Sequence, residues 1–148
     1  MKNPWIRTAI VAVLQISLLL FGCSRSAPEA TATHAQTEPE TLSRTEFTGR
    51  VENYFEYQPL HAGNSSQFLI HLTDMSDGSP VENAEVTLAV RATNSADVAT
   101  KTVARVGKVT GIYVAELNVP RAGSYDVEFH IKNGKLDERI SSSPFKVE

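Results

Sequence analysis

Apolar and polar residues alternate along much of the chain after residue 44, and this is the spacing of β-strands that are buried on one face. The clearest case is YDVEFHI, in which every second side chain is apolar: Tyr125, Val127, Phe129 and Ile131. Asp126, Glu128 and His130 would share the opposite face. Phe129 is therefore a predicted core residue.

The same alternation predicts further strands at QFLIHLT (residues 67–73), where Phe68 is a core position, and at AEVTLAVR (84–91). GIYVAELNV (111–119) is apolar on both faces, because Ile112 and Val114 add to the alternating set. We expect this strand to be covered on both faces and central in its sheet. Weaker patterns predict strands within residues 47–56, 98–106 and 140–147.

Turn-rich segments separate these seven predicted strands, and no segment shows the apolar stripe of an amphipathic helix. Pro59 and Gly63 mark one such turn, because proline fixes φ and glycine tolerates positive φ. Seven short strands in about 100 residues favour an all-β immunoglobulin-like β-sandwich. PRAGSY supports it, since Gly123 followed by Tyr125 resembles a tyrosine corner, in which the hydroxyl binds upstream backbone. The alternative is that Tyr125 only fills the core.

Residues 1–22 read as a secretion signal, with Lys2 and Arg7 before an uncharged stretch at residues 8–21. That stretch is shorter than the roughly 20 apolar residues of a membrane-spanning helix. It ends in LFGC, which resembles the lipobox of bacterial lipoproteins. The resemblance implies lipid attachment at Cys23, the only cysteine. The alternative is that Cys23 ends an uncleaved anchor.

Residues 23–44 would then comprise the lipidated Cys23 and a flexible linker, since Leu42 is the only large apolar residue from Ser24 to Arg44. A lipidated protein is tethered to a membrane. Ser24 stands where lipoproteins retained at the inner membrane often carry aspartate. The resemblance thus favours the periplasmic face of the outer membrane over the inner membrane.

Residues 45–148 have the size of a single domain. They contain ten Lys and Arg against fourteen Asp and Glu, a net charge of −4, with no basic stripe, so we expect no nucleic-acid partner. They contain no cysteine, so packing must hold the domain without a disulfide. No serine lies in a Gly-x-Ser-x-Gly elbow and no glycine-rich phosphate loop occurs, so the chain reads as a non-enzyme.

One stretch carries a more specific resemblance. EYQPLHAGNSSQFLIHLTD (56–74), followed by GSPVENAEVTLAV (78–90), resembles the N-terminal domain of periplasmic adaptor subunits of heavy-metal efflux systems of the resistance-nodulation-division type. The short motifs GIYVAEL (111–117) and PRAGSY (120–125) resemble patterns that recur more widely among bacterial immunoglobulin-like modules, including those similar to FixH and YtkA. The chain has none of the lipoyl, hairpin and barrel domains of full adaptors. An accessory role beside an efflux-system protein is what the resemblance implies.

His61, His71 and Met75 are the candidate metal ligands, because only this region brings imidazole and thioether close together in the sequence. Imidazole suits Zn(II) and Cu(II), whereas thioether suits Cu(I), so a copper or zinc ion is the candidate cofactor. No Cys or paired-histidine motif strengthens the site. The alternative, which we weigh more heavily, is that each of the three is an ordinary surface or hydrogen-bonded residue.

Two functional hypotheses follow. The first is a lipid-anchored periplasmic binding or accessory module linked to envelope heavy-metal efflux or homeostasis, of the copper-handling type. The second is a structural or protein-interaction lipoprotein of the envelope without a metal role, which makes its contacts through sheet edges.

Replacing Cys23 with Ala should release the protein from membranes, because residues 24–148, which follow the predicted signal peptide and Cys23, contain no apolar segment that could hold it there. Fractionation after a salt wash measures this. Retention of the Cys23→Ala variant in the membrane pellet would contradict lipid anchoring.

Overall fold

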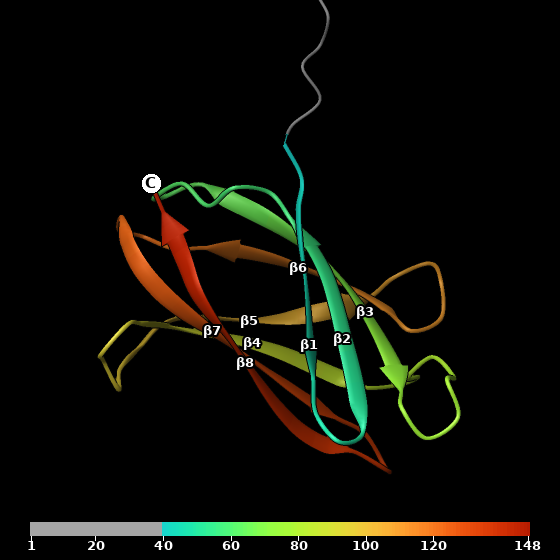
Figure 1. The fold of residues 1–148 in the computed structure, drawn as a ribbon. Coiled ribbons are helices and arrows are strands. Elements are labelled where there is room, and N and C mark those ends of the chain that lie inside the picture. Colours follow the sequence, from blue (N-terminus) through green and yellow to red (C-terminus); the bar gives the residue numbers. More distant parts are fainter. Residues whose placement is uncertain (1–39) are drawn as a thin grey trace, which may run out of the picture. The chain divides into compact units, whose positions relative to one another are not determined.

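The computed structural model describes residues 40–148, which form eight antiparallel strands and no helix (Figure 1). The strands are β1 (Leu42–Phe47), β2 (Val51–Tyr57), β3 (Ser65–Asp74), β4 (Glu85–Ala92), β5 (Val98–Val106), β6 (Ile112–Asn118), β7 (Gly123–Lys132) and β8 (Asp137–Val147). The predicted signal peptide, Cys23 and the linker as far as residue 39 lie outside the described residues. Within residues 40–148, no helix is long and apolar enough to cross a membrane.

The alternating pattern of the sequence determines which side chains face the core. Along β2, buried and half-buried residues alternate strictly, and β3, β6 and β7 behave in the same way over most of their length. Phe68 and Phe129, both predicted core residues, are fully buried. The inward side chains of all strands except β1 belong to one hydrophobic cluster, so residues 40–148 share a single core.

The eight strands form one nearly closed sheet in the order β1-β2-β3-β6-β5-β4-β7-β8. The structure therefore confirms the expected all-β fold. It shows one sheet of eight strands, however, and not the expected sandwich of seven strands. Strand β5 joins the two halves, because it pairs with β4 from Val98 to Ala104 and with β6 at Arg105 and Val106. As predicted, β6 is central, since it lies between β3 and β5.

The edge strands β1 and β8 meet at a seam that side chains close. Arg44 donates a hydrogen bond to the carbonyl of Pro144 (2.7 Å), and Ser142 donates one to the carboxylate of Glu46 (2.6 Å). The guanidinium of Arg44 also lies 4.3 Å from the ring centroid of Phe145, within cation–π range. Charged side chains therefore occupy inward positions of β1.

The strand predicted within residues 47–56 is present as β2, but its start was placed too early, because the chain turns at residues 48–50 and forms the hairpin β1–β2. The separate strand β1 was not predicted. The Thr48 hydroxyl accepts hydrogen bonds from the backbone N–H groups of Arg50 and Val51, which stabilises this turn. Strand β1 begins at Leu42, so it includes three residues that we expected in the linker. Its inward Arg44 and Glu46 are charged, and the apolar alternation that marks the other strands is missing.

The segment before β7 has the hydrogen bond expected of a tyrosine corner. The hydroxyl of Tyr125 donates to the carbonyl of Arg121 at 2.9 Å. Gly123 has a φ of +153°, a backbone conformation that residues with a side chain rarely adopt, so glycine suits the position. Gly63 has the positive φ predicted for the turn before β3, at +77°.

Replacing Phe129 with Ala should lower the free energy of unfolding by about 3–5 kcal/mol, because it leaves a cavity in the core. Val109→Ala is the control: its side chain is 61% exposed, and a change within about 0.5 kcal/mol is expected. Denaturant unfolding measures both variants. A loss below about 1 kcal/mol for Phe129→Ala would mean that the core is packed differently.

Candidate functional site

The outward face of β2, β3 and β6 carries several aromatic, histidine and aliphatic side chains that are half-buried. In the strand register, Tyr54 of β2 lies opposite His71 of β3, which lies opposite Ile112 of β6. All three side chains are half-buried. They form a continuous row across three neighbouring strands, because cross-strand partners on one face stand about 5 Å apart.

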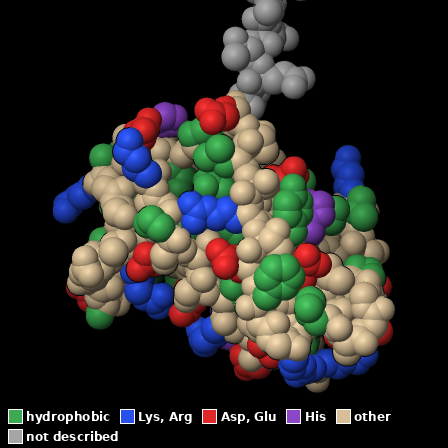
Figure 2. All heavy atoms as spheres, viewed as in Figure 1, with side chains coloured by type: hydrophobic (Ala, Val, Ile, Leu, Met, Phe, Trp, Pro, Cys, Tyr) green, Lys and Arg blue, Asp and Glu red, His purple; other side chains and the backbone are tan. Residues whose placement is uncertain are grey.

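A second row runs beside the first. Leu69 of β3 lies opposite Val114 of β6, and both side chains are half-buried. We call the five residues of the two rows the outer stripe: Tyr54, Leu69, His71, Ile112 and Val114. Figure 2 shows hydrophobic side chains and a histidine interspersed with acidic side chains over the part of the surface where β1, β2 and β3 lie.

His71 lies in an aromatic setting within the outer stripe. Its ring packs edge-on against Tyr54, with centroids 5.3 Å apart and an interplanar angle of 63°. Its Nε2 atom is buried and has no hydrogen-bond partner among residues 40–148. The Tyr54 hydroxyl donates to the carboxylate of Glu56 (3.1 Å) at the edge of the stripe. His71 thus serves here mainly as a ring that covers apolar surface.

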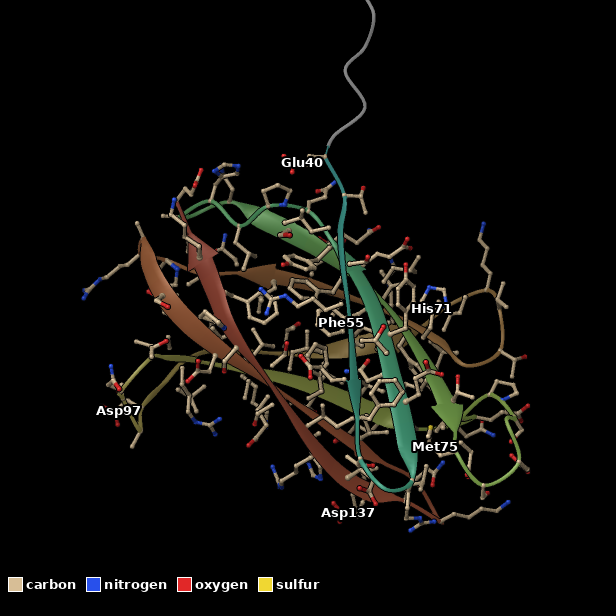
Figure 3. The ribbon with its side chains drawn as sticks, viewed as in Figure 1. Glu40, Phe55, His71, Met75, Asp97 and Asp137 are labelled. Atoms are coloured by element: carbon tan, nitrogen blue, oxygen red, sulfur yellow. The ribbon has the colours of Figure 1, made fainter. Side chains whose placement is uncertain are left out.

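The three candidate metal ligands are not brought together. His61 precedes β3, next to the C-terminus, where Ala62 N–H donates to the carbonyl of Glu148. Met75 follows β3 at its other end, where its N–H donates to the carbonyl of Arg50. The ten residues of β3 separate the two, a length of about 30 Å at about 3.4 Å per residue. Figure 3 shows His71 between these ends and Met75 beside the β1–β2 turn.

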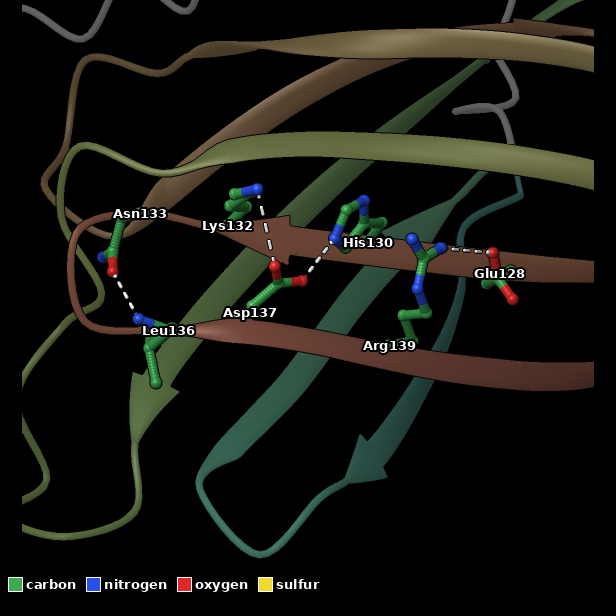
Figure 4. Close-up of polar contacts among 7 residues, drawn as sticks. All are labelled: Glu128, His130, Lys132, Asn133, Leu136, Asp137 and Arg139. Atoms are coloured by element: carbon green, nitrogen blue, oxygen red, sulfur yellow. Dashed lines mark hydrogen bonds and ion pairs between the residues drawn. The ribbon is translucent and has the colours of Figure 1, made fainter.

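Residues 40–148 contain no group of three or more His, Cys, Asp or Glu side chains that could hold a metal ion. Of the side chains predicted on one face of β7, Glu128 and His130 form cross-strand pairs with β8 (Figure 4), whereas Asp126 accepts a hydrogen bond from the Thr93 hydroxyl. His130 Nε2 lies 2.7 Å from Asp137, and Glu128 accepts a hydrogen bond from Arg139 at 3.1 Å. The hydrogen bond from His130 lowers the pKa of Asp137 below its ordinary value, with Lys132 adding to the effect.

A hollow of about 400 Å³ lies between the loop before β4 and the β7–β8 turn. Its lining includes Asp74, Asn133 and Lys135. Asp74 accepts hydrogen bonds from the hydroxyl and the backbone N–H of Ser76, and these lower its pKa. This carboxylate is therefore held ionised in a turn, which does not suit a general acid.

No protein-family model matches this chain, and comparison with curated proteins and with solved structures finds no match either. The function must therefore be inferred from the chain's own residues. Sequence reasoning noted Ile112 and Val114 as apolar residues in addition to the alternating set of their strand. It could not place them beside Tyr54 and His71, because the strand register was unknown.

Because its candidate ligands are separated, the protein should bind Cu(I), Cu(II) and Zn(II) no more tightly than about 100 μM. Calorimetric titration of the full chain in detergent measures this, with a His61→Ala, His71→Ala double variant as the comparison. Micromolar or tighter binding by the wild-type protein that the double variant loses would contradict this prediction and show that the histidines bind a metal ion.

Proposed function

We propose that this protein is a non-catalytic docking module, anchored by lipid at Cys23 on the periplasmic side of a bacterial membrane. Its outer stripe would bind a partner protein of the envelope. The observation that carries the proposal is the run of five half-buried aromatic, histidine and aliphatic side chains across β2, β3 and β6.

The physical basis is the normal behaviour of antiparallel sheets. Such a sheet commonly packs one face on the core and leaves the other solvated, so the second face is polar. Here the inward face already holds Phe55, Phe68 and Tyr113, and apolar side chains also gather on the outward face. A contiguous exposed apolar patch rimmed by polar residues is typical of an interaction site. Glu56 and Glu116 supply part of that rim.

We further propose that the fold is of the immunoglobulin-like class. The strand neighbours β2-β3-β6 and β4-β7-β8 agree with the A-B-E and C-F-G groups of that fold when β2 is taken as its first strand. The bond between Tyr125 and Arg121 at the start of β7 also agrees with it. Strand β1 would be an addition at the edge. Loops and sheet faces of such domains commonly carry protein contacts.

The partner class rests on the resemblance to efflux adaptor subunits. The resembling stretch, residues 56–74, spans the end of β2 and all of β3, and it supplies Leu69 and His71 to the outer stripe. A component of a heavy-metal efflux system is therefore the partner that we favour, with the module as its accessory. An envelope protein unrelated to metals is the second candidate. Neighbouring genes for efflux or copper handling would favour the first.

Replacing Leu69 with Lys should abolish docking, because it places a charge in the middle of the apolar stripe. Asp97→Lys is the matched control, since Asp97 is exposed and lies in the β4–β5 loop, far from His71 (Figure 3). The measurement is native gel migration of the chain from membranes solubilised in mild detergent.

The wild-type protein and Asp97→Lys are expected in a complex larger than the single chain, and Leu69→Lys is expected alone. Circular dichroism should show that both variants remain folded. A wild-type protein that migrates alone, or a Leu69→Lys variant that stays in the complex, would argue against the outer stripe as the docking face.

A further inference from the structure

Within residues 40–148, strand β5 has a backbone edge that no other strand covers. On one side, Val98 to Ala104 pair with β4, whereas on the other side β5 pairs with β6 only at Arg105 and Val106. Within residues 40–148, no other backbone hydrogen bond reaches Val98–Ala104. A row of free N–H and C=O groups of this kind is a template on which another strand can pair.

The side chains along this edge are cationic. Residues 98–109 contain Lys101, Arg105 and Lys108 and no acidic residue, although the chain as a whole has a net charge of −3. None of the three has an ion-pair or hydrogen-bond partner in the described part of the chain. The cations on β4, β7 and β8, by contrast, pair with neighbouring carboxylates, as Arg139 does with Glu128.

Exposed valines accompany these charges. Val98, Val103 and Val106 on β5 are 46%, 59% and 64% exposed. Lys101, Val103 and Arg105 stand at alternate positions of the strand, so their side chains share one face. A strand added beside β5 would place its own side chains directly opposite them.

Lysine on an edge strand can also serve only to prevent association with other chains. Protective edges are commonly short and polar. Strand β5 is nine residues long and combines its cations with exposed valines. Its charge and its apolar surface together fit one kind of occupant, a strand that carries acidic and apolar side chains in turn on the face that it shares with Lys101 and Val103.

We propose that the β5 edge binds an extended acidic segment of a partner protein as an added β-strand. A glutamate or aspartate side chain of that segment lies opposite Lys101, and an apolar side chain on the same face lies opposite Val103. Arg105, which itself pairs with β6, adds positive charge at the end of the free edge. Backbone hydrogen bonds supply affinity, and the paired charges select the sequence. The site shares no residue with the outer stripe, although Arg105 lies opposite Val114 where β5 and β6 pair.

The test uses the full chain purified in detergent and a synthetic heptapeptide, capped at both ends, with Glu at positions 2 and 6, Val at position 4 and Thr elsewhere. Its Glu and Val side chains share one face of the extended peptide. Fluorescence anisotropy should give a Kd on the order of 100 μM or tighter at low salt. Affinity should fall as salt rises from about 50 to about 500 mM, because exposed charge pairs are screened. Hydrogen exchange should show slower amide exchange in residues 98–104 when the peptide is bound.

Two altered peptides separate the sources of affinity. A peptide with Gln in place of Glu loses the charge pairs and should bind about tenfold more weakly. A peptide with alternate backbone nitrogens methylated keeps its charges but cannot complete the ladder, and it should not bind.

On the protein side, a Lys101→Gln, Arg105→Gln double variant should bind the Glu peptide about tenfold more weakly. Lys135→Gln is the matched control, because Lys135 is an exposed cation in the β7–β8 turn. The affinity of this variant for the Glu peptide should be unchanged. No binding by the wild-type chain at about 1 mM peptide would overturn the proposal. So would equal binding of the methylated peptide, or equal binding by the double variant.

Discussion

Burial of a cluster of aromatic rings between the two halves of the sheet is the interaction on which the rest of this structure depends. Phe55 of β2 lies 4.8 Å from Phe129 of β7 and 6.2 Å from Phe145 of β8, measured between ring centroids, and 6.0 Å from Phe68 of β3. Rings at these distances gain about 0.5–1.5 kcal/mol per pair beyond their burial. Residues 45–148 have no cysteine, so this packing holds the halves together without a disulfide.

The same packing decides what the outer surface displays. Side chains of a strand point alternately to its two faces, so a strand that buries Phe55 must direct Tyr54 outward, and one that buries Phe68 and Ile70 must direct Leu69 and His71 outward. A slip of one residue in register would exchange the two sets, at the expense of the core. The proposed docking face is therefore as firmly positioned as the core itself, which suits a module that presents a preformed surface to a partner.

How much the sequence could predict depended on where each side chain finds its partners. The strand containing Phe129 and the tyrosine corner at Tyr125 were predictable, because alternation and turn residues are local signals. Strand β1 was not, because its inward Arg44 and Glu46 are satisfied by Pro144 and Ser142, about a hundred residues away in the chain. The outer stripe likewise depends on the register of β2, β3 and β6, which is set by the folded sheet rather than by any one segment.

His71 illustrates the difference between a residue type and a site: imidazole is a good metal ligand, but here the ring packs on Tyr54 in an apolar row. The central claim is that the outer stripe, which contains this row, contacts a protein partner. Site-specific photo-crosslinking in the cell envelope tests it most directly, with a photoreactive amino acid at Val114 and, separately, at Asp97. We expect position 114 to yield a discrete crosslink to a second protein and position 97 to yield none. Equal crosslinking at both positions, or none at position 114, would contradict the account.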